Sequence, residues 1–389
     1  MNNCRRLRIK SVCLLFIVIT SCVAQINDNE SSYHYFPPLY DQVKIIETSD
    51  TIHFGLETDM YNQIESSSLF IQGSSRYVSF YDETSLSLGI FNFDSQRLSK
   101  RIYLQDIFPG KSFYKLSAYM INFDSILISN KSKIYLIDSS GKIKKVIKTG
   151  LSNLFQFDNT TPPVIANNKL YASVRMSVRE TSLKKIKNWR ILYEYDLVDN
   201  SGTLKYMLPR YYGKAYYGRR LMQQYYCLNR KGHFVISFAA DSLAYETNLL
   251  DYNNSYFAKS KYQDGAIPPI KKDDLLNDQG YKQSVLRDAY GPIYYDSYKN
   301  RYLRIFKRKL TVKDFELKKT IREQSIIVMN HKFQIVGENL ISGGIDANSL
   351  MIDEKGNIFA RVKTGDEYAI HLVRLDERQI DQSNQLVKQ

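Results

Sequence analysis

The sequence predicts an all-β fold, and more specifically a six-bladed β-propeller of four-stranded blades. Short apolar segments with period-two alternation run through most of the chain, and polar turns containing Gly or Asn separate them. The pattern also recurs every ~40–60 residues, a spacing typical of propeller blades. Such a unit cannot bury both of its faces alone, but radial packing against its neighbours does so.

Six units are expected. The first places strands at 68–71, 76–81, 86–93 and 99–104, and similar units begin near 117, 163, 224, 293 and 349. Three units share an apolar segment that ends in Asp, at 134–138, 192–196 and 370–376. A strand at 43–46 or 51–54 is expected to pair with the last unit and close the ring. The alternative is a pair of β-sandwich domains.

The amino terminus has the parts of a secretory signal. Basic residues precede a short apolar stretch at 12–19, which is about half of the ~20 residues that a membrane span needs. The following Ile19-Thr20-Ser21-Cys22 resembles the lipobox of bacterial lipoproteins. That resemblance implies cleavage before Cys22 and a lipid on its thiol. It also implies a cell-envelope location, with Val23 favouring the outer membrane.

These signals divide the chain into four parts. We expect a signal peptide at 1–21, a lipidated flexible tether at 22–40, a propeller domain at 41–378 and a disordered tail at 379–389. Cleavage would leave Cys227 as the only thiol besides Cys22, which excludes an intrachain disulfide in the domain. We expect Cys227 to act as a small buried apolar residue.

The chain is basic, with a formal charge of +14 that falls to +10 without the four basic residues of the signal. Basic residues concentrate at 184–190, 210–231 and 301–322, which suits an acidic partner. Two segments interrupt the strand pattern. A charged stretch at 181–189 is a short helix or a loop, and 250–292 is expected to be a long insertion with one helical turn at 271–279.

One cluster within these segments is the candidate ligand site. It alternates tyrosines, arginines and glycines, a composition that offers stacking surfaces and fork-shaped anion contacts. The predicted ligand-binding residues are Arg210, Tyr211, Tyr212, Tyr216, Tyr217, Arg219 and Arg220.

No catalytic constellation stands out. The five histidines are scattered without metal-ligand spacing, and no nucleophile elbow, phosphate loop or calcium loop is present. We therefore expect no catalytic residue, no metal and no cofactor. Adjacent carboxylates in turns do not establish the opposed pair that glycoside hydrolysis needs.

The mature chain resembles a Bacteroidota lipoprotein family known as domain of unknown function 4221. The resemblance rests on its length, on the lipobox at 19–22, on Tyr81-Asp82-Glu83 with 90–94, and on the stretch 254–262. It implies similarity to other exported six-bladed propellers and carries no assigned activity.

These inferences predict a lipid-anchored binding protein of the cell envelope. Its expected partners are the membrane, through Cys22, and an anionic glycan or a protein. Nucleic acid is not expected, because an exported protein has little access to it. Two alternatives share the scaffold, a glycan-directed hydrolase or lyase and a scaffold subunit of an envelope complex, because a fold does not fix a function.

Overall fold

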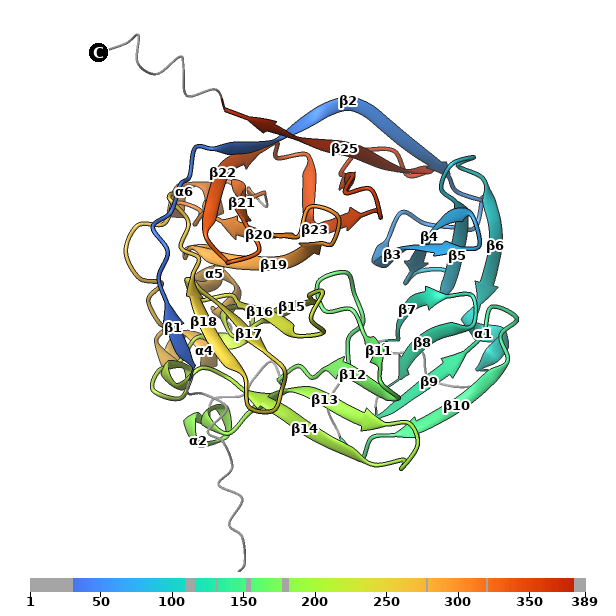
Figure 1. Ribbon diagram of the computed structural model, residues 1–389, viewed down its shortest axis with the longest axis horizontal. Helices are drawn as coiled ribbons and strands as arrows, with labels where there is room; N and C mark the ends of the chain where they lie inside the picture. Colours follow the sequence, from blue (N-terminus) through green and yellow to red (C-terminus); the bar gives the residue numbers. More distant parts are fainter. Residues whose placement is uncertain are drawn as a thin grey trace, which may run out of the picture.

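The computed structural model describes residues 31–108, 116–130, 132–151, 155–176, 182–277, 279–319 and 321–380. Within these residues, six sheets stand around a central axis like the blades of a propeller (Figure 1). Five of the described sheets have four strands and one has five. The predicted six-bladed propeller is confirmed, and the alternative of β-sandwich domains is wrong.

The first three blades follow one another along the chain, each running from the innermost to the outermost strand. Blade 1 contains β3 (Ile64–Gln72), β4 (Ser75–Asp82), β5 (Ser87–Asn92) and β6 (Leu98–Tyr103). Blade 2 contains β7 (Ser117–Asn122), β8 (Ser125–Asn130), β9 (Lys133–Ile137) and β10 (Ile143–Lys148). Blade 3 contains β11 (Val164–Ala166), β12 (Lys169–Ser173), β13 (Arg190–Asp196) and β14 (Gly202–Met207).

The last three blades include two strands from the amino-terminal part of the chain. Blade 4 contains β15 (Gln224–Leu228), β16 (Phe234–Phe238), β17 (Leu243–Thr247), β18 (Asn253–Phe257) and, outside them, β1 (Ser32–His34). Blade 5 contains β19 (Ala289–Asp296), β20 (Arg301–Lys307), β21 (Gln324–Met329) and β22 (Ile335–Ile341). Blade 6 contains β23 (Ile345–Ile352), β24 (Ile358–Val362), β25 (Ala369–Gln379) and β2 (Val43–Gly55).

The two ends of the propeller domain meet in blade 6. Strand β2 pairs antiparallel with β25, from Val43 opposite Gln379 to Gly55 opposite Ala369. Both segments predicted to close the ring, 43–46 and 51–54, lie in this strand, so the predicted closure is confirmed. Because β2 and β25 pair in one sheet, the ring has no unpaired strand edge between the two ends of the domain.

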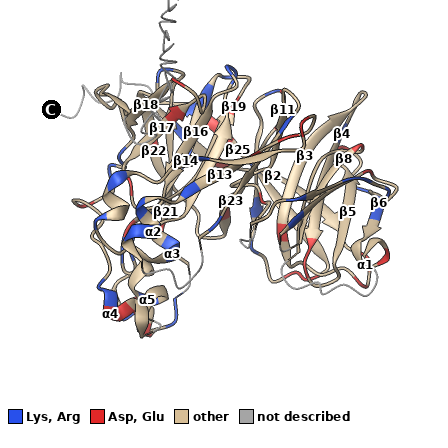
Figure 2. Ribbon diagram, turned by 90° about the horizontal axis from the view of Figure 1, so that it is seen from below, with Lys and Arg blue, Asp and Glu red and all other residues tan. Residues whose placement is uncertain are grey.

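The connections between strands fall on two faces. Because the innermost strand comes first and neighbouring strands are antiparallel, the tight turns after the first and third strands lie on one face, the turn face. Among the described residues the other connections lie on the opposite face, which carries the helices and is called the helix face (Figure 2). The exception is the segment between β1 and β2, which runs along the edge of blade 5 back to the turn face. The described helices are α1 (Leu104–Ile107), α2 (Leu183–Lys187), the 3-10 helix η1 (Arg210–Gly213), α3 (Gly218–Leu221), α4 (Lys272–Leu276), α5 (Gly280–Val285) and α6 (Val312–Glu316).

The structure differs from the expectation at the edge of blade 4. Strand β18 lies inside the segment 250–292 that was expected to be an insertion, and β1 lies inside the expected tether. Strand β1 pairs parallel with β18, and the His34 ring stacks on Tyr256 with centroids 5.2 Å apart. Polar residues obscure both strands in the sequence, because β1 is the edge strand of this sheet and β18 lies next to it at the outer side of the blade.

Burial between blades explains the composition of the strands. All five residues of β16 are buried, since both faces of this middle strand pack against neighbouring blades. Many of the abundant tyrosines serve this packing, and Tyr81, Tyr226 and Tyr290 are less than 2% exposed. No helix in the described part of the chain is long and apolar enough to cross a membrane.

Candidate functional site at the channel mouth

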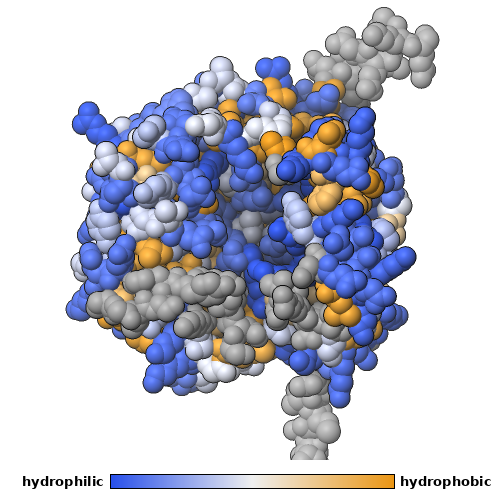
Figure 3. Space-filling view, turned by 180° about the vertical axis from the view of Figure 1, so that it is seen from behind, coloured by the Kyte–Doolittle hydropathy of each residue, from blue (hydrophilic) through white to orange (hydrophobic). Residues whose placement is uncertain are grey.

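A large cavity opens on the helix face where the central channel ends. It consists of an outer part of about 1060 Å³ and an inner part of about 300 Å³, and residues such as Glu65, Arg175 and Arg220 line both. We call the two parts together the channel-mouth cavity. Figure 3 looks onto this face and shows a central hollow surrounded by hydrophilic residues. The volume falls in or slightly above the range of typical small-molecule sites.

Two irregular strands supply residues to the cavity. In β3, the register with β4 shifts between Ile64 and Ser66, which leaves Glu65 as the extra residue of a bulge. In β23, the register with β24 shifts between Asp346 and Met351, and Asn348 and Ser349 lie in that interval. Bulges re-aim side chains and are common beside functional sites. Here they bring acids and amides to the channel mouth.

The inner part has a hydrogen-bonded polar floor. Arg175 donates through Nη2 to Asp158 Oδ2 at 2.8 Å and through Nη1 to Gln156 Oε1. The Asp158 carboxylate also accepts the backbone N–H groups of Thr160 and Thr161 at 2.9 Å. Asp158 therefore holds the loop before blade 3 and fixes Arg175 at the same time.

Cations from other blades complete the floor. Lys307 Nζ donates to Asn348 Oδ1 at 2.7 Å, and Arg361 Nη2 donates to the Asn62 carbonyl at 2.8 Å. Burial, with a contribution from nearby Arg322, lowers the pKa of Lys307 to about 8. Both cations donate to neutral hydrogen-bond acceptors, and Asp346 is the acid whose charge acts on both of them.

Glu65 is the titratable acid of the site. Removal from bulk water raises its pKa to about 7, and a hydrogen bond and repulsion from Glu83 act in the same direction. Near neutral pH a substantial fraction of Glu65 is therefore uncharged. The cavity carries five cationic side chains and three acidic ones, so its net charge is positive: Arg175, Arg219, Arg220, Lys307 and Arg361 against Glu65, Asp158 and Asp346.

The outer part is more apolar and is walled by the helices. Trp189 and Leu208 come from blade 3, and Leu275 and Tyr281 come from α4 and α5. Gly218, with φ +67°, begins α3 where a β-carbon would lie 2.9 Å from Leu275 Cδ2. Only glycine allows α3 to start so close to α4 without strain.

Two arginines of α3 project at the edge of this wall. Arg220 lies over the Tyr281 ring, with Cζ 4.7 Å from the ring centroid. Burial, together with the adjacent charges of Arg175 and Arg220, lowers the pKa of Arg219. Neither Arg219 nor Arg220 is ion-paired to a described residue. Uncompensated cations gathered at a cavity favour an anionic ligand.

The structure divides the predicted ligand-binding cluster in two. Arg219 and Arg220 line the cavity. Tyr211, Tyr212 and Tyr217 pack against one another instead, with Tyr212 fully buried and its hydroxyl donating to the Leu221 carbonyl at 2.9 Å. The remaining two, Tyr216 and the exposed Arg210, are not among the residues that line it. The tyrosines therefore anchor the loop that presents the arginines.

Other sequence expectations concern single residues. Cys227 is half-buried against the core of blades 3–5, and burial raises the pKa of its thiol. The signal at 1–21, Cys22 and the tail beyond residue 380 lie outside the described residues.

Among the described residues no group of three ligand-type side chains could hold a metal ion. Ring closure does bring His53 and His371 together, with 2.7 Å between their Nδ1 atoms.

The fold and the cavity define a six-bladed propeller with a ligand-sized, positively charged site at one end of its channel. The family model described as domain of unknown function DUF4221 matches residues 42–340. The chain belongs to this family.

Solved structures support the fold assignment. A DUF4221 member from Bacteroides vulgatus is 18% identical, with a TM-score of 0.74 over 87% of this chain and 99% of its own. A Bacteroides fragilis protein described as exported is 9% identical, with a TM-score of 0.53 over 90% of this chain and 99% of its own. At sequence identities this low, the similarity to these two structures shows the fold alone. None of the curated proteins compared with the chain matches it.

Proposed function

We propose that this protein binds an acidic saccharide in the channel-mouth cavity. The observation that carries the proposal is the pair Arg219 and Arg220, which border a ligand-sized cavity without an ion-pair partner in the described chain. An arginine presents a planar fork that matches a carboxylate or a sulfate. A ligand with such a group would supply the missing counter-charge.

The rest of the lining favours a saccharide over a bare anion. The floor offers the side-chain amide of Gln223, which suits a ligand rich in hydroxyls, whereas Ser66 and Asn159 are hydrogen-bonded within the protein. The carboxylate of Asp346, which among the described residues accepts only through Oδ1 from Asn348, can accept a hydrogen bond from such a hydroxyl. Asp158 is engaged by Arg175, Thr160 and Thr161, and both carboxylates would repel a polyphosphate. Trp189 and Tyr281 add aromatic surface in the outer part, against which a sugar ring can pack.

A glycan array containing acidic and neutral polysaccharides tests the proposal. We expect binding to members that carry uronate or sulfate groups and none to neutral ones. The double variant Arg219→Ala/Arg220→Ala should weaken that binding at least tenfold at low salt, because charged hydrogen bonds contribute ~1.5–3 kcal/mol each. The exposed Lys332 and Lys355 lie on the turn face, and their double alanine variant controls for net charge. Equal binding of acidic and neutral glycans, or unchanged affinity in the arginine variant, would refute the site.

Binding should also depend on pH through Glu65. Protonated Glu65 is neutral, so affinity for an anion is highest below pH 7 and falls as the pH rises through about 7. A sulfated saccharide is the suitable probe, because its own charge does not change in this range. We expect a loss of about fivefold, as for one unit charge ~4 Å away in water. Titration calorimetry from pH 5.5 to 7.5 measures it, a range that stays below the pKa of about 8 of Lys307 in the same cavity. Glu65→Gln should remove most of the dependence in this range.

We further propose that the protein is held at the cell envelope by a lipid on Cys22. The described chain starts at the turn face, because β1 runs parallel to β18 toward the helix face. A lipid attached upstream would leave the channel-mouth cavity directed away from the membrane. Replacing Cys22 with Ser should shift the protein from the membrane fraction to the soluble fraction, and retention in the membrane would contradict the anchor.

A further inference from the structure

We infer that the ligand of the channel-mouth cavity is an end or a segment of an acidic polysaccharide, which leaves the cavity over α3 and α2 toward the rim of blades 3 and 4. This inference rests on the proposed function and specifies the size of the ligand. It follows from the distribution of charge around the cavity on the helix face.

The basic side of the face begins inside the cavity. Arg219 and Arg220 line the outer part, and the chain just before α3 forms η1. Gly213 of η1 lies directly against Lys187 of α2, since a β-carbon on Gly213 would come within 2.8 Å of Lys187 Cβ. Two residues after Lys187, Trp189 lines the cavity. The end of α2 is therefore part of the cavity rim.

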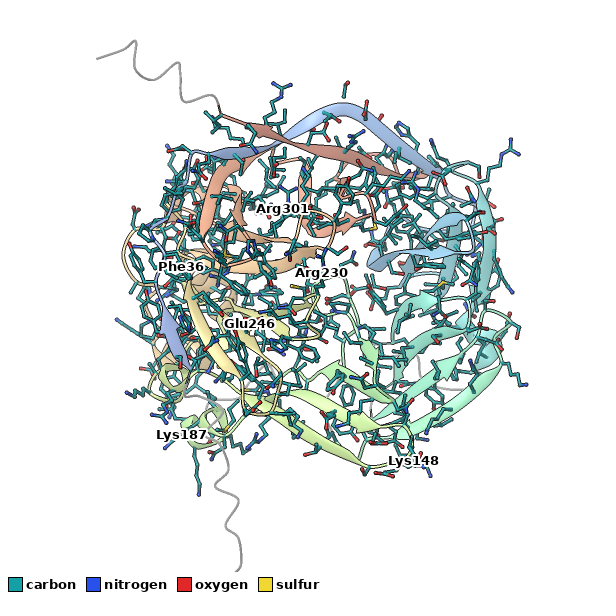
Figure 4. The ribbon with its side chains drawn as sticks, in the orientation of Figure 1. Phe36, Lys148, Lys187, Arg230, Glu246 and Arg301 are labelled. Carbon is teal, nitrogen blue, oxygen red and sulfur yellow. The ribbon has the colours of Figure 1, made fainter. Side chains whose placement is uncertain are left out.

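Cations continue outward from this rim. Lys184 and Lys187 of α2 and Lys214 after η1 are exposed, and none is ion-paired within the described residues. We call these three residues the rim lysines. Figure 2 shows Lys and Arg grouped on α2 and α3, and Figure 4 shows Lys187 at the outer edge of the disc. A helix advances about 1.5 Å per residue, so Lys184 lies ~4.5 Å along α2 from Lys187.

The opposite side of the same face is acidic. Glu57 and Asp59 lie before blade 1, where both pair with Arg101, Glu83 hydrogen-bonds to Glu65, and Asp106 lies in α1. Against Arg101 and Lys148, these four acids leave that side with an excess of negative charge. A polyanion that left the cavity on that side would meet like charges. The side with α2 and α3 carries positive charge instead. The electrostatic field of the protein therefore directs the polysaccharide over the rim lysines.

The test measures how affinity changes with the length of the ligand. We compare a short and a long oligogalacturonate by titration calorimetry, using the wild-type protein and two triple variants. The first, Lys184→Ala/Lys187→Ala/Lys214→Ala, removes the rim lysines and keeps the β-carbon of residue 187 against Gly213. The second, Lys231→Ala/Lys332→Ala/Lys355→Ala, removes the same charge from exposed turn-face lysines.

The long oligomer should bind the wild-type protein about tenfold more tightly than the short one, as expected of three solvent-screened contacts. Loss of this gain in the rim variant alone, with the short oligomer unaffected, would support the inference. No gain in the wild type, or equal loss in both variants, would overturn it. Failure of the short oligomer to bind would refute the proposed function as well. Equal, rim-dependent binding of single-stranded DNA of matched charge would overturn the assignment to a polysaccharide.

Discussion

Replacing Arg304 with Met is expected to destabilise the protein by about 3–5 kcal/mol, because it removes the donor from a fully buried polar cluster. Arg304 belongs to β20 of blade 5 and is 0% exposed. Its guanidinium donates to four acceptors of blade 4 and the segments that follow its strands: Ser237 Oγ at 2.9 Å, the carbonyls of Ser242 and Ala258 at 3.1 Å, and the Asp241 carbonyl at 2.6 Å.

The Arg304 cluster also has an aromatic side. Cζ lies 3.8 Å from the centroid of the Tyr290 ring, and burial lowers the pKa of the guanidinium. Methionine fills similar space but leaves the carbonyls without donors. Urea unfolding followed by circular dichroism measures the loss. Arg308→Met, at an exposed ion pair with Glu323, is the control and should cost less than ~1 kcal/mol. An equally small effect at Arg304 would show that water can replace the guanidinium.

Replacing Phe54 with Ala is expected to cost a similar ~3–5 kcal/mol, since it opens a cavity at the joint that closes the ring. Phe54 belongs to β2 and is 0% exposed. Its ring centroid lies 5.5 Å from that of Phe80, 5.4 Å from that of Phe91 and 6.0 Å from that of Phe93, all in blade 1 or just after β5. One side chain of the amino-terminal strand therefore ties blade 6 to blade 1.

The effect of Phe54→Ala should appear in two measurements. The urea midpoint falls, and limited proteolysis cuts the variant within 43–63 faster than the wild type, because β2 separates more often from β25. Tyr368→Ala, in the same blade but 81% exposed, should leave both unchanged. Unchanged proteolysis in Phe54→Ala, despite lower stability, would contradict the idea that this contact holds the ring closed.

The strand pattern was the most predictable feature. The apolar segments that end in Asp138, Asp196 and Asp376 lie at β9, β13 and β25, and each of these is the third strand of its blade. Their regularity has a local cause: the Asp138 carboxylate accepts the N–H groups of Ser140 and Lys142 and so sets the turn into the next strand. Short-range chemistry of this kind repeats visibly in the sequence.

The candidate site was much less predictable. Sequence composition predicted ligand binding by Arg219 and Arg220, which line the cavity, but grouped them with tyrosines that turn inward. Glu65, Arg175, Lys307 and Arg361 were missed, because they come from separate blades and stand in unremarkable strand contexts. The register shift that exposes Glu65 depends on its pairing with β4, which no local motif encodes.

The amino-acid sequence by itself determined the all-β class, the number of blades, the closing strand and the excess of basic charge. Alternating side chains and turn residues suffice for these, since each acts within a few positions of the chain. Tertiary structure alone decided which tyrosines became core, that β1 joined blade 4, and which charged groups met at the channel mouth. Those outcomes depend on the packing of blades around a common axis, which brings residues more than 200 positions apart into one cavity.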